Sequence, residues 1–480
     1  MKTKIAGGSI IGFNGIKHVL LERGDVVFED DRIVYVGPRY KEKVERVIDA
    51  ASMLVIPGLI NVHTHSLSAA LLYRGILEDE GQTLYKYLLP VRYGTTSTPP
   101  YVRGSDAHLL SQVTLLEILK SGATTILEQT DNLEGVLKAA QTLGIRIYGC
   151  HSYFSGMPYE KDGKILYPPF KDHCHGFEEN LRLIREYQNT CNGRVRVWLG
   201  PHAPDTCSTD LLQETRKKAD ELQVGIATHV SQSLTEFNEI KRRFKMTPIE
   251  YLNNMGFLKE DVVAAHAIHT TSSDISIMAH SGMTVAHCAS SYVKNGIHVP
   301  MARYRKCGIN VVIGTDQNSM DLIDEMRLAM FSSKLNEDDP YATTVLDMFN
   351  AVTLHAAKAL GRIDIGRIAP GAKADIILLN MKQPHLTPYR DPLKMLLYHG
   401  NRNDVYTVIV DGQIVMADRK ILTVDEEEVI TKAVEVAHRI WKTVEKETGL
   451  PNLIIERMRS HRIGSGINNS LNPAITSQRS

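Results

Sequence analysis

The sequence predicts an α/β fold in which a (β/α)8 barrel carries a small β-sandwich built from both chain ends. Short apolar runs alternate with longer amphipathic segments between about residues 54 and 316. Eight such runs imply a parallel sheet, and eight is the number of strands that closes a barrel. A doubly wound open sheet is the alternative, but no glycine-rich phosphate loop follows the first run. The barrel is therefore the predicted fold.

The two chain ends share a different pattern, in which short β-rich segments are joined by tight turns. Residues 25–37, DVVFEDDRIVYVG, show two such segments around EDD, which is typical of a hairpin. Residues 405–422 indicate a second hairpin, with Asp411 and Gly412 at its turn. The predicted regions are residues 1–56 (β-sandwich, N-terminal part), 57–364 (barrel), 365–423 (β-sandwich, C-terminal part) and 424–480 (C-terminal helix and flexible tail).

Predicted helices separate the eight predicted barrel strands. Residues 105–122 and 210–224 are amphipathic, and Gly122 stands where a glycine commonly ends a helix. The strands are LVIPGLINV (54–62), TTILEQT (124–130), RIYGCHSYF (146–154), VRVWLGPHA (195–203), GIATHV (225–230), VVAAHAIH (262–269), MTVAHCAS (283–290) and NVVIGTD (310–316).

A further helix is predicted over residues 424–447. Thr423 and Glu426 have the spacing of a capping box at its start. An apolar stripe at steps of three and four is expected to pack against the barrel or a second subunit; it comprises Ile430, Val434, Ala437, Trp441 and Val444. The polar, turn-rich residues 465–480 are expected to be loosely attached.

Composition bounds the cellular location and the partners. The 480 residues are 43% apolar and 23% charged, and Lys plus Arg and Asp plus Glu both total 55. Zero net charge gives no support for nucleic acid or an anionic membrane as a partner. Six scattered cysteines without a CxxC pair suggest reduced thiols, and no apolar run is long enough to span a bilayer. A soluble, cytoplasmic protein is predicted.

Histidines stand at the ends of the predicted strands, where the catalytic groups of (β/α)8 barrels lie. The first run ends in NVHTH, so that His63 and His65 point the same way on an extended segment. Five later runs end in His202, His229, His266, His287 and Asp316. A single histidine at a strand end is usually structural, but so many together predict a metal site.

Imidazoles with a carboxylate suit zinc or iron and leave an open position for water. A bound divalent cation lowers the pKa of that water towards neutrality, which makes hydrolysis possible near pH 7. The fourth run, VWLGPH, carries no lysine that could bridge two ions. One divalent metal per subunit is therefore expected, zinc before iron.

At these motifs the sequence resembles the amidohydrolase superfamily, in the branch of the S-adenosylhomocysteine/methylthioadenosine deaminases and the triazine hydrolases, which include atrazine chlorohydrolase. The matching stretches are PGLINVHTH, GPHAPDTCS, AAHAIH, GTDQNSMDLIDEMRLA and GRIAPGAKADIILL, within residues 5–420. The resemblance implies that His63, His65, His229 and Asp316 are metal ligands. It also implies that His266 hydrogen-bonds the attacking water or the substrate, that His202 faces the substrate, and that the chain forms a homo-oligomer, most simply a homodimer.

The chain departs from that family in three places. The usual His-x-x-Glu is here HVSQ, and Gln232 can donate or accept hydrogen bonds but cannot carry a proton. Cys288 and Tyr292 stand where asparagines are common, and residues 77–90 show no match to the glutamate that binds ribose in nucleoside deaminases. These departures weaken the case for an adenosine-type substrate.

The sequence predicts a metal-dependent hydrolase that attacks an electrophilic carbon of a small nitrogen compound, above all an N-heterocycle. An amine, ammonia or another group leaves. Asp316 is the first candidate to accept the proton of the attacking water, and His266, as an imidazole that titrates near neutral pH, is the second. Gln232 is expected to orient the substrate.

Two alternatives remain open at this point. One is a standard deaminase in which Asp316 or His266 replaces the missing glutamate, and the other is a catalytically inactive scaffold. His173 and His175 could form a second metal site, although an exposed loop pair is the favoured interpretation.

Overall fold

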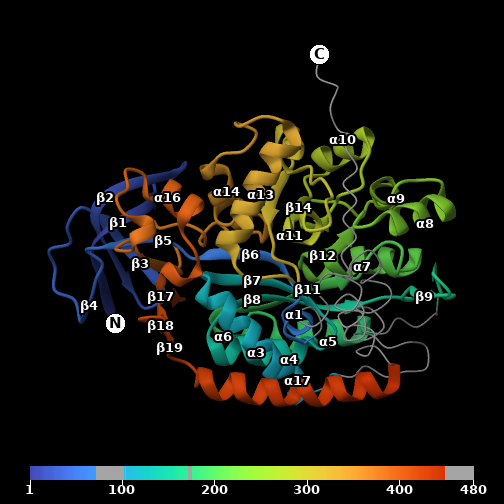
Figure 1. The fold of residues 1–480 in the computed structure, drawn as a ribbon, viewed down its shortest axis with the longest axis horizontal. Helices are drawn as coiled ribbons and strands as arrows, with labels where there is room; N and C mark the ends of the chain where they lie inside the picture. Colours follow the sequence, from blue (N-terminus) through green and yellow to red (C-terminus); the bar gives the residue numbers. More distant parts are fainter. Residues whose placement is uncertain (72–101, 103, 171–175, 449–480) are drawn as a thin grey trace, which may run out of the picture.

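Eight parallel strands form the predicted barrel in the computed structural model, which describes residues 1–71, 102, 104–170 and 176–448 (Figure 1). Their order in the sheet is β15-β14-β13-β12-β11-β8-β7-β6. A parallel bridge between Thr64 and Asp316 brings the last strand to the first, so the barrel is nearly closed. The strands are β6 (Leu59–Thr64), β7 (Ala123–Thr130), β8 (Arg146–Tyr153), β11 (Val195–Pro201), β12 (Ile226–Val230), β13 (Val262–His266), β14 (Thr284–His287) and β15 (Asn310–Ile313).

The helices and a small hairpin connect these strands. The predicted helices are present as α3 and α7, and Gly122 follows α3 with φ +90°, its N–H donating to Leu119 O at 2.9 Å. The connecting elements are α1 (Ser66–Leu71), α3 (Ser105–Lys120), α4 (Leu133–Leu143), the hairpin β9 (Tyr159–Lys161) and β10 (Lys164–Leu166), α5 (Phe177–Tyr187), α6 (Thr190–Gly193), α7 (Thr209–Leu222), α8 (Leu234–Phe244), α9 (Pro248–Asn254), α10 (Ser272–Ser281), α11 (Ser290–Val293), α12 (Met301–Lys306), α13 (Leu322–Glu337), α14 (Val345–Ala351) and α15 (Leu354–Ala359).

The first predicted strand, residues 54–62, is in fact two strands in two different sheets. It divides at Gly58, between β5 (Met53–Pro57) and β6. A Cβ atom on Gly58 would overlap the side chain of Thr124, so only glycine allows the two backbones to approach here. The Pro57–Gly58 dipeptide inside this apolar run was the available signal of the break.

Both chain ends contribute to one nine-stranded mixed sheet, at the left of Figure 1. Both predicted hairpins are present, and the turn at Asp411 (φ +52°) and Gly412 (φ +78°) has the two positive φ values of a type I′ turn. The remaining elements are β1 (Lys2–Phe13), β2 (His18–Glu29), β3 (Arg32–Gly37), β4 (Arg46–Asp49), β16 (Ile376–Asn380), η3 (Pro384–Leu386), α16 (Pro392–His399), η4 (Arg402–Asp404), β17 (Val405–Val410), β18 (Gln413–Ala417) and β19 (Lys420–Ile421).

A buried group of charges joins this sheet to the barrel. Arg146, the first residue of β8, donates from Nε and Nη2 to the carboxylate of Asp375 at 2.9 and 3.0 Å. Its Nη2 also lies 3.1 Å from Oδ1 of Asp411, to which Lys373 Nζ is paired at 2.8 Å. All four side chains are buried, so these contacts replace the water that the charges lose on folding.

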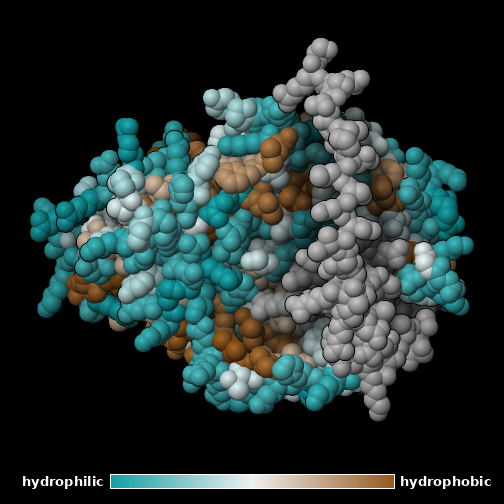
Figure 2. All heavy atoms as spheres, in the orientation of Figure 1, coloured by the Kyte–Doolittle hydropathy of each residue, from teal (hydrophilic) through white to brown (hydrophobic). Residues whose placement is uncertain are grey.

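The C-terminal helix α17 (Glu426–Thr448) packs on α3 and runs along the lower edge of the molecule in Figure 1. Hydrophobic residues gather above it along this junction in Figure 2. Two predictions about the helix were wrong. Asp425 caps it by accepting from Glu428 N at 3.1 Å, whereas the hydroxyl of Thr423 donates to Leu143 O. Ala433 and Ile440 form its buried face with Val429, while the predicted stripe residues Ile430 and Val434 are 45% and 48% exposed.

Ala437 and Trp441 of the predicted stripe do pack against the buried cluster of α3. The side chain of Val444 and residues 465–480 lie outside the described residues. None of the described helices is both long and apolar enough to cross a membrane.

Candidate metal centre

Three histidines from two strands converge at the carboxyl edge of the barrel. His63 lies in β6, His65 follows it, and His229 lies in β12; all three are buried. Their ligand atoms lie within 4.8 Å of one another, and the Nε2 atoms of His65 and His229 are 3.2 Å apart. Zinc–nitrogen bonds of about 2.0–2.1 Å in a tetrahedral site place two nitrogens about 3.3 Å apart. The spacing of these imidazoles therefore fits one shared metal ion.

Backbone carbonyl groups set the tautomers that such a site needs. Nδ1 of His65 lies 2.5 Å from Gln129 O, and Nδ1 of His229 lies 2.7 Å from His202 O. A carbonyl oxygen only accepts, so each Nδ1 must carry the proton and each Nε2 presents a lone pair. Ring nitrogens held in this way are typical of metal-ligating histidines.

Asp316, which follows β15, brings a carboxylate to the three histidines from the strand beside β6. Its Oδ1 lies 3.4 Å from His65 Nε2 and 3.9 Å from His63 Nε2. Its Oδ2 accepts from Ser291 Oγ at 2.6 Å, which leaves Oδ1 to face the histidines. Burial raises the pKa of Asp316 above its usual range, and the Ser291 hydrogen bond and the charge of Lys294 oppose that rise. A cation at the histidines would favour the ionised carboxylate.

The backbone of Asp316 also closes the barrel beside the site. Asp316 N donates to His63 O at 2.9 Å, and His65 N donates to Asp316 O at 3.3 Å. Asp316 has φ +56°, in the left-handed region that non-glycine residues seldom adopt. The last strand is thus hydrogen-bonded to the first at the point where the candidate ligands meet.

The other predicted site residues surround this cluster. His202 follows β11, with Nδ1 3.1 Å from Thr206 Oγ1 and its ring centroid 5.0 Å from that of His229. His266 ends β13 with φ +79°, and its ring lies 5.3 Å from His63 and 5.5 Å from His229. Gln232 is half-buried on the turn after β12.

Burial changes the expected chemistry of His266. It lowers the pKa of this imidazole to about 3, with a smaller effect from His287. His266 is therefore neutral at pH 7, and the prediction that it titrates near neutral pH was wrong. It can donate or accept a hydrogen bond, but it is a weak base.

Buried glutamates near the site escaped the sequence analysis. Glu128 of β7 accepts from Ser66 N at 2.8 and 3.0 Å and from Ser66 Oγ at 2.9 Å, directly after His65. Glu236 of α8 accepts from Ser231 N at 2.6 Å and Gln232 N at 2.8 Å, shortly after His229. Burial raises the pKa of Glu236 above its usual range, and Asp205 adds to the rise. A glutamate at the end of an apolar strand, as in LEQT, was the one available signal.

Some predicted features cannot be placed in this structure. His173, His175 and residues 77–90 lie outside the described residues.

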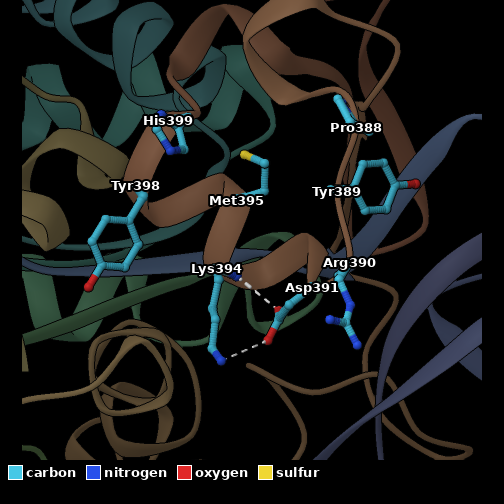
Figure 3. A pocket seen from close by; sticks show the side chains of 8 residues that line it. All are labelled: Pro388, Tyr389, Arg390, Asp391, Lys394, Met395, Tyr398 and His399. Atoms are coloured by element: carbon cyan, nitrogen blue, oxygen red, sulfur yellow. Dashed lines mark hydrogen bonds and ion pairs between the residues drawn. The ribbon is translucent and has the colours of Figure 1, made fainter.

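A separate cavity of about 630 Å³ lies at α16, lined by Pro388, Tyr389, Arg390, Asp391, Lys394, Met395, Tyr398 and His399 (Figure 3). No predicted site residue lines it.

The fold and the site place this protein in the class of barrel metallohydrolases, because a (β/α)8 barrel carries three histidines at its carboxyl edge that can hold a metal ion. More narrowly, the chain belongs to the amidohydrolase family, whose sequence model matches residues 54–415. The predicted family and fold are confirmed, and the chain is an enzyme, a hydrolase, rather than a scaffold.

Known proteins of two activities are similar over almost the whole chain. A 5′-deoxyadenosine deaminase from Methanothermobacter thermautotrophicus is 35% identical over 437 residues, which covers 89% of this chain and 96% of the relative. A 5-methylthioadenosine/S-adenosylhomocysteine deaminase from Desulforudis audaxviator is 34% identical, over 88% of this chain and 96% of the relative. The structure of a glutamate-to-glutamine mutant of atrazine chlorohydrolase from Arthrobacter aurescens, complexed with zinc and atraton, superposes with a TM-score of 0.82 at 23% identity, over 91% of this chain and 100% of that chain.

Proposed function

We propose that this hydrolase acts on an N-heterocycle and displaces a substituent from an electrophilic ring carbon. The observation that carries the proposal is the convergence of His63, His65, His229 and Asp316, with 3.2 Å between two imidazole nitrogens and 3.4 Å to the carboxylate. We assign these four residues as ligands of one divalent cation, zinc before iron. Such a cation would supply a hydrolytic nucleophile, because it lowers the pKa of water towards neutrality.

The surrounding residues take roles that their contacts support. Asp316 accepts the proton of the attacking water, since Ser291 anchors Oδ2 and Oδ1 faces the site. His266 is neutral and buried, which suits a hydrogen bond to the substrate. His202 lies against His229 on the adjacent strand and is assigned to the substrate side of the site.

Gln232 sets the preference for the leaving group. An amine is a poor leaving group unless it is protonated, and a carboxamide cannot deliver that proton. Chloride leaves without protonation. In the chloride reaction, water adds to the ring carbon, the carbon–chlorine bond breaks with its electron pair, and one proton is released. We therefore infer a preference for substituents that leave as anions.

Deamination is the second candidate function, and the names of the 35% and 34% identical relatives favour it. In this case Asp316 passes the proton of the attacking water to the departing amine. Both candidates share the site and the N-heterocyclic ring. They differ in the leaving group.

A matched pair of substrates separates the two candidates. The metal-loaded enzyme is assayed with 5′-deoxyadenosine and with the analogue that carries chloride in place of the exocyclic amine. The chloride compound should have the higher kcat/KM, and Gln232→Glu should raise turnover of the amine by about a hundredfold, as expected for a restored general acid. Equal or faster turnover of the amine by the parent enzyme would favour deamination, and no turnover of either would contradict the substrate class.

We also propose that the chain forms a homo-oligomer in the cytoplasm. Ile430 and Val434 of α17 expose apolar surface, which supports a contact with a second copy. No disulfide joins the cysteines that the structure describes, as expected in a reducing compartment. Light scattering at micromolar concentration tests the assembly, and a monomer would contradict it.

A further inference from the structure

Gln232 and Tyr292, at which the sequence departs from the pattern expected from its resemblance, are in contact. Tyr292 lies in α11, after β14, and its hydroxyl donates to the backbone carbonyl of Gln232 at 3.1 Å. The same tyrosine ring meets His266 edge to face, with 5.3 Å between centroids. Tyr292 is only 8% exposed and packs with Ile268 and Val299. A single rigid side chain thus contacts two groups that the proposed reaction uses.

The turn that carries Gln232 is held from its other side by Glu236. Both oxygens of this fully buried carboxylate accept from the peptide N–H groups of Ser231 and Gln232, at 2.6 and 2.8 Å. Ser231 has φ +50°, so the turn adopts a conformation that must be imposed by its surroundings. Its carbonyl accepts from Ile268 N and His269 N, each at 3.1 Å.

These contacts fix the backbone of Gln232 at both its N–H and its C=O. By contrast, the side-chain amide of Gln232 makes no hydrogen bond to any residue that the structure describes. A half-buried amide on a fixed backbone, three residues after His229, is suited to bind a ligand. Removing one backbone contact should therefore move the amide without unfolding the barrel.

We propose that Tyr292 and Glu236 are positioning residues that hold Gln232 for the substrate, with Tyr292 setting the specificity by fixing Gln232 and His266 together. The inference rests on the proposed function and takes the Gln232 amide as the group that orients the heterocycle near its leaving group. An amide presents both a donor and an acceptor, which matches a neutral ring edge with an acceptor nitrogen beside a donor or a halogen. The preferred ligand class is a neutral N-heterocycle.

A double-mutant cycle tests this assignment. Tyr292→Phe keeps the ring against His266 and removes the hydroxyl, and Gln232→Ala removes the amide. With the chloride analogue of 5′-deoxyadenosine, Tyr292→Phe should raise KM roughly three- to tenfold with little change in kcat, the size expected for one lost hydrogen bond. In the Gln232→Ala background the same substitution should change KM by less than about twofold, because the positioned group is gone. Equal effects in both backgrounds would overturn the assignment.

A measurement without substrate keeps the test independent of the proposed function. In protein labelled with ¹⁵N in its glutamine side chains, the Gln232 amide signals are those lost in Gln232→Ala. These signals should shift or broaden in Tyr292→Phe, and stay unchanged in Tyr398→Phe. Tyr398 is an exposed tyrosine at the α16 cavity in Figure 3, with its hydroxyl 3.2 Å from Lys334 Nζ, and serves as the matched control.

The two measurements separate the two claims. Unmoved Gln232 signals in Tyr292→Phe would overturn the positioning role even if the enzyme hydrolyses the chloride compound. Shifted signals in an enzyme that hydrolyses neither compound would contradict the proposed function and leave the positioning role supported.

Discussion

Replacing Arg146 by Met tests what joins the sheet of the chain ends to the barrel. Arg146 is fully buried, and its Nε and Nη2 pair with Asp375 at 2.9 and 3.0 Å. Met is uncharged and fills the space of the arginine stem, so the substitution removes the cation while keeping most of the packing. The change in the free energy of unfolding then depends on the contacts that Asp375 and Asp411 keep.

The two carboxylates differ in what remains after the loss of Arg146. Asp411 keeps Lys373 at 2.8 Å and Arg194 at 3.7 Å. Asp375 keeps only the N–H of Asp411 at 2.7 Å as a side-chain contact among the described residues. One buried carboxylate therefore loses its cation, and breaking such a pair typically costs about 3–5 kcal/mol. We expect Arg146→Met to lower the free energy of unfolding by about that amount.

Equilibrium unfolding in urea, followed by two spectroscopic probes, measures the loss. Arg216→Met is the control, because the partners of Arg216, Asp220 and Asp261, are 48% and 35% exposed, and water can replace the lost cation at a cost of about 1 kcal/mol. The double variant Arg146→Met/Asp375→Asn should regain stability, since no uncompensated charge remains. The reasoning is refuted if Arg146→Met costs no more than the control, or if the double variant is less stable still.

Two further predictions concern the metal and pH. His229→Ala and Asp316→Ala should lose bound metal and activity together, and full metal occupancy in either purified variant would show that the ligand assignment is wrong. Asp316→Asn should abolish turnover even where some metal is retained. Burial lowers the pKa of His18 from about 6.5 to about 4, so the unfolded chain binds the extra proton first as pH falls. The contribution of neutral His18 to stability is complete above about pH 6.5 and is lost towards pH 4. The urea midpoint should therefore fall less between pH 7 and pH 5 in His18→Gln than in the parent protein. An equal fall in both proteins would contradict this.

The sequence allowed the eight barrel strands and the histidine cluster to be predicted for a simple geometric reason. Apolar runs that end in a polar metal-binding side chain mark both a buried strand and its carboxyl end. His63 and His65 show this most clearly, because their spacing of two places both on one side of an extended segment. Their convergence with His229 follows from the closure of the barrel.

Local detail around these elements could not be predicted, because competing residues satisfy the same rule. Thr423 and Asp425 are both residue types that cap helices well. Asp425 caps α17, because the hydroxyl of Thr423 donates to Leu143 O instead. The predicted apolar stripe of α17 and the stripe that is buried are offset by one position. The buried stripe includes Ala433 and Ile440, which pack against α3. Likewise, the pKa of His266 depends on burial by residues distant in the sequence.

The same limit applies to the glutamates that shape the mouth of the barrel. Glu128, Glu236 and Glu325 are all buried, and each accepts from peptide N–H groups just after a strand that ends at the site. An isolated buried carboxylate is costly, so these acids persist because the turn supplies donors that would otherwise be unsatisfied. Burial raises the pKa of Glu325 to about 7, so the loss of hydration outweighs the hydrogen bonds from Ser290 and Ala289 that favour its charged form.

Residues in the left-handed region also lie at the ends of strands that reach the site. Ser231, His266 and Asp316 have φ values of +50°, +79° and +56°. Backbone strain of this kind persists only where the surroundings impose it, and at Ser231 and Gln232 the carboxylate of Glu236 and the hydroxyl of Tyr292 provide such contacts. The strands and the residues directly after them place the candidate metal ligands, whereas the turn after β12 positions Gln232. Under the proposed function, substitutions around these turns would change the leaving group while the strands stay the same, so Gln232 and Tyr292 are the residues to vary first.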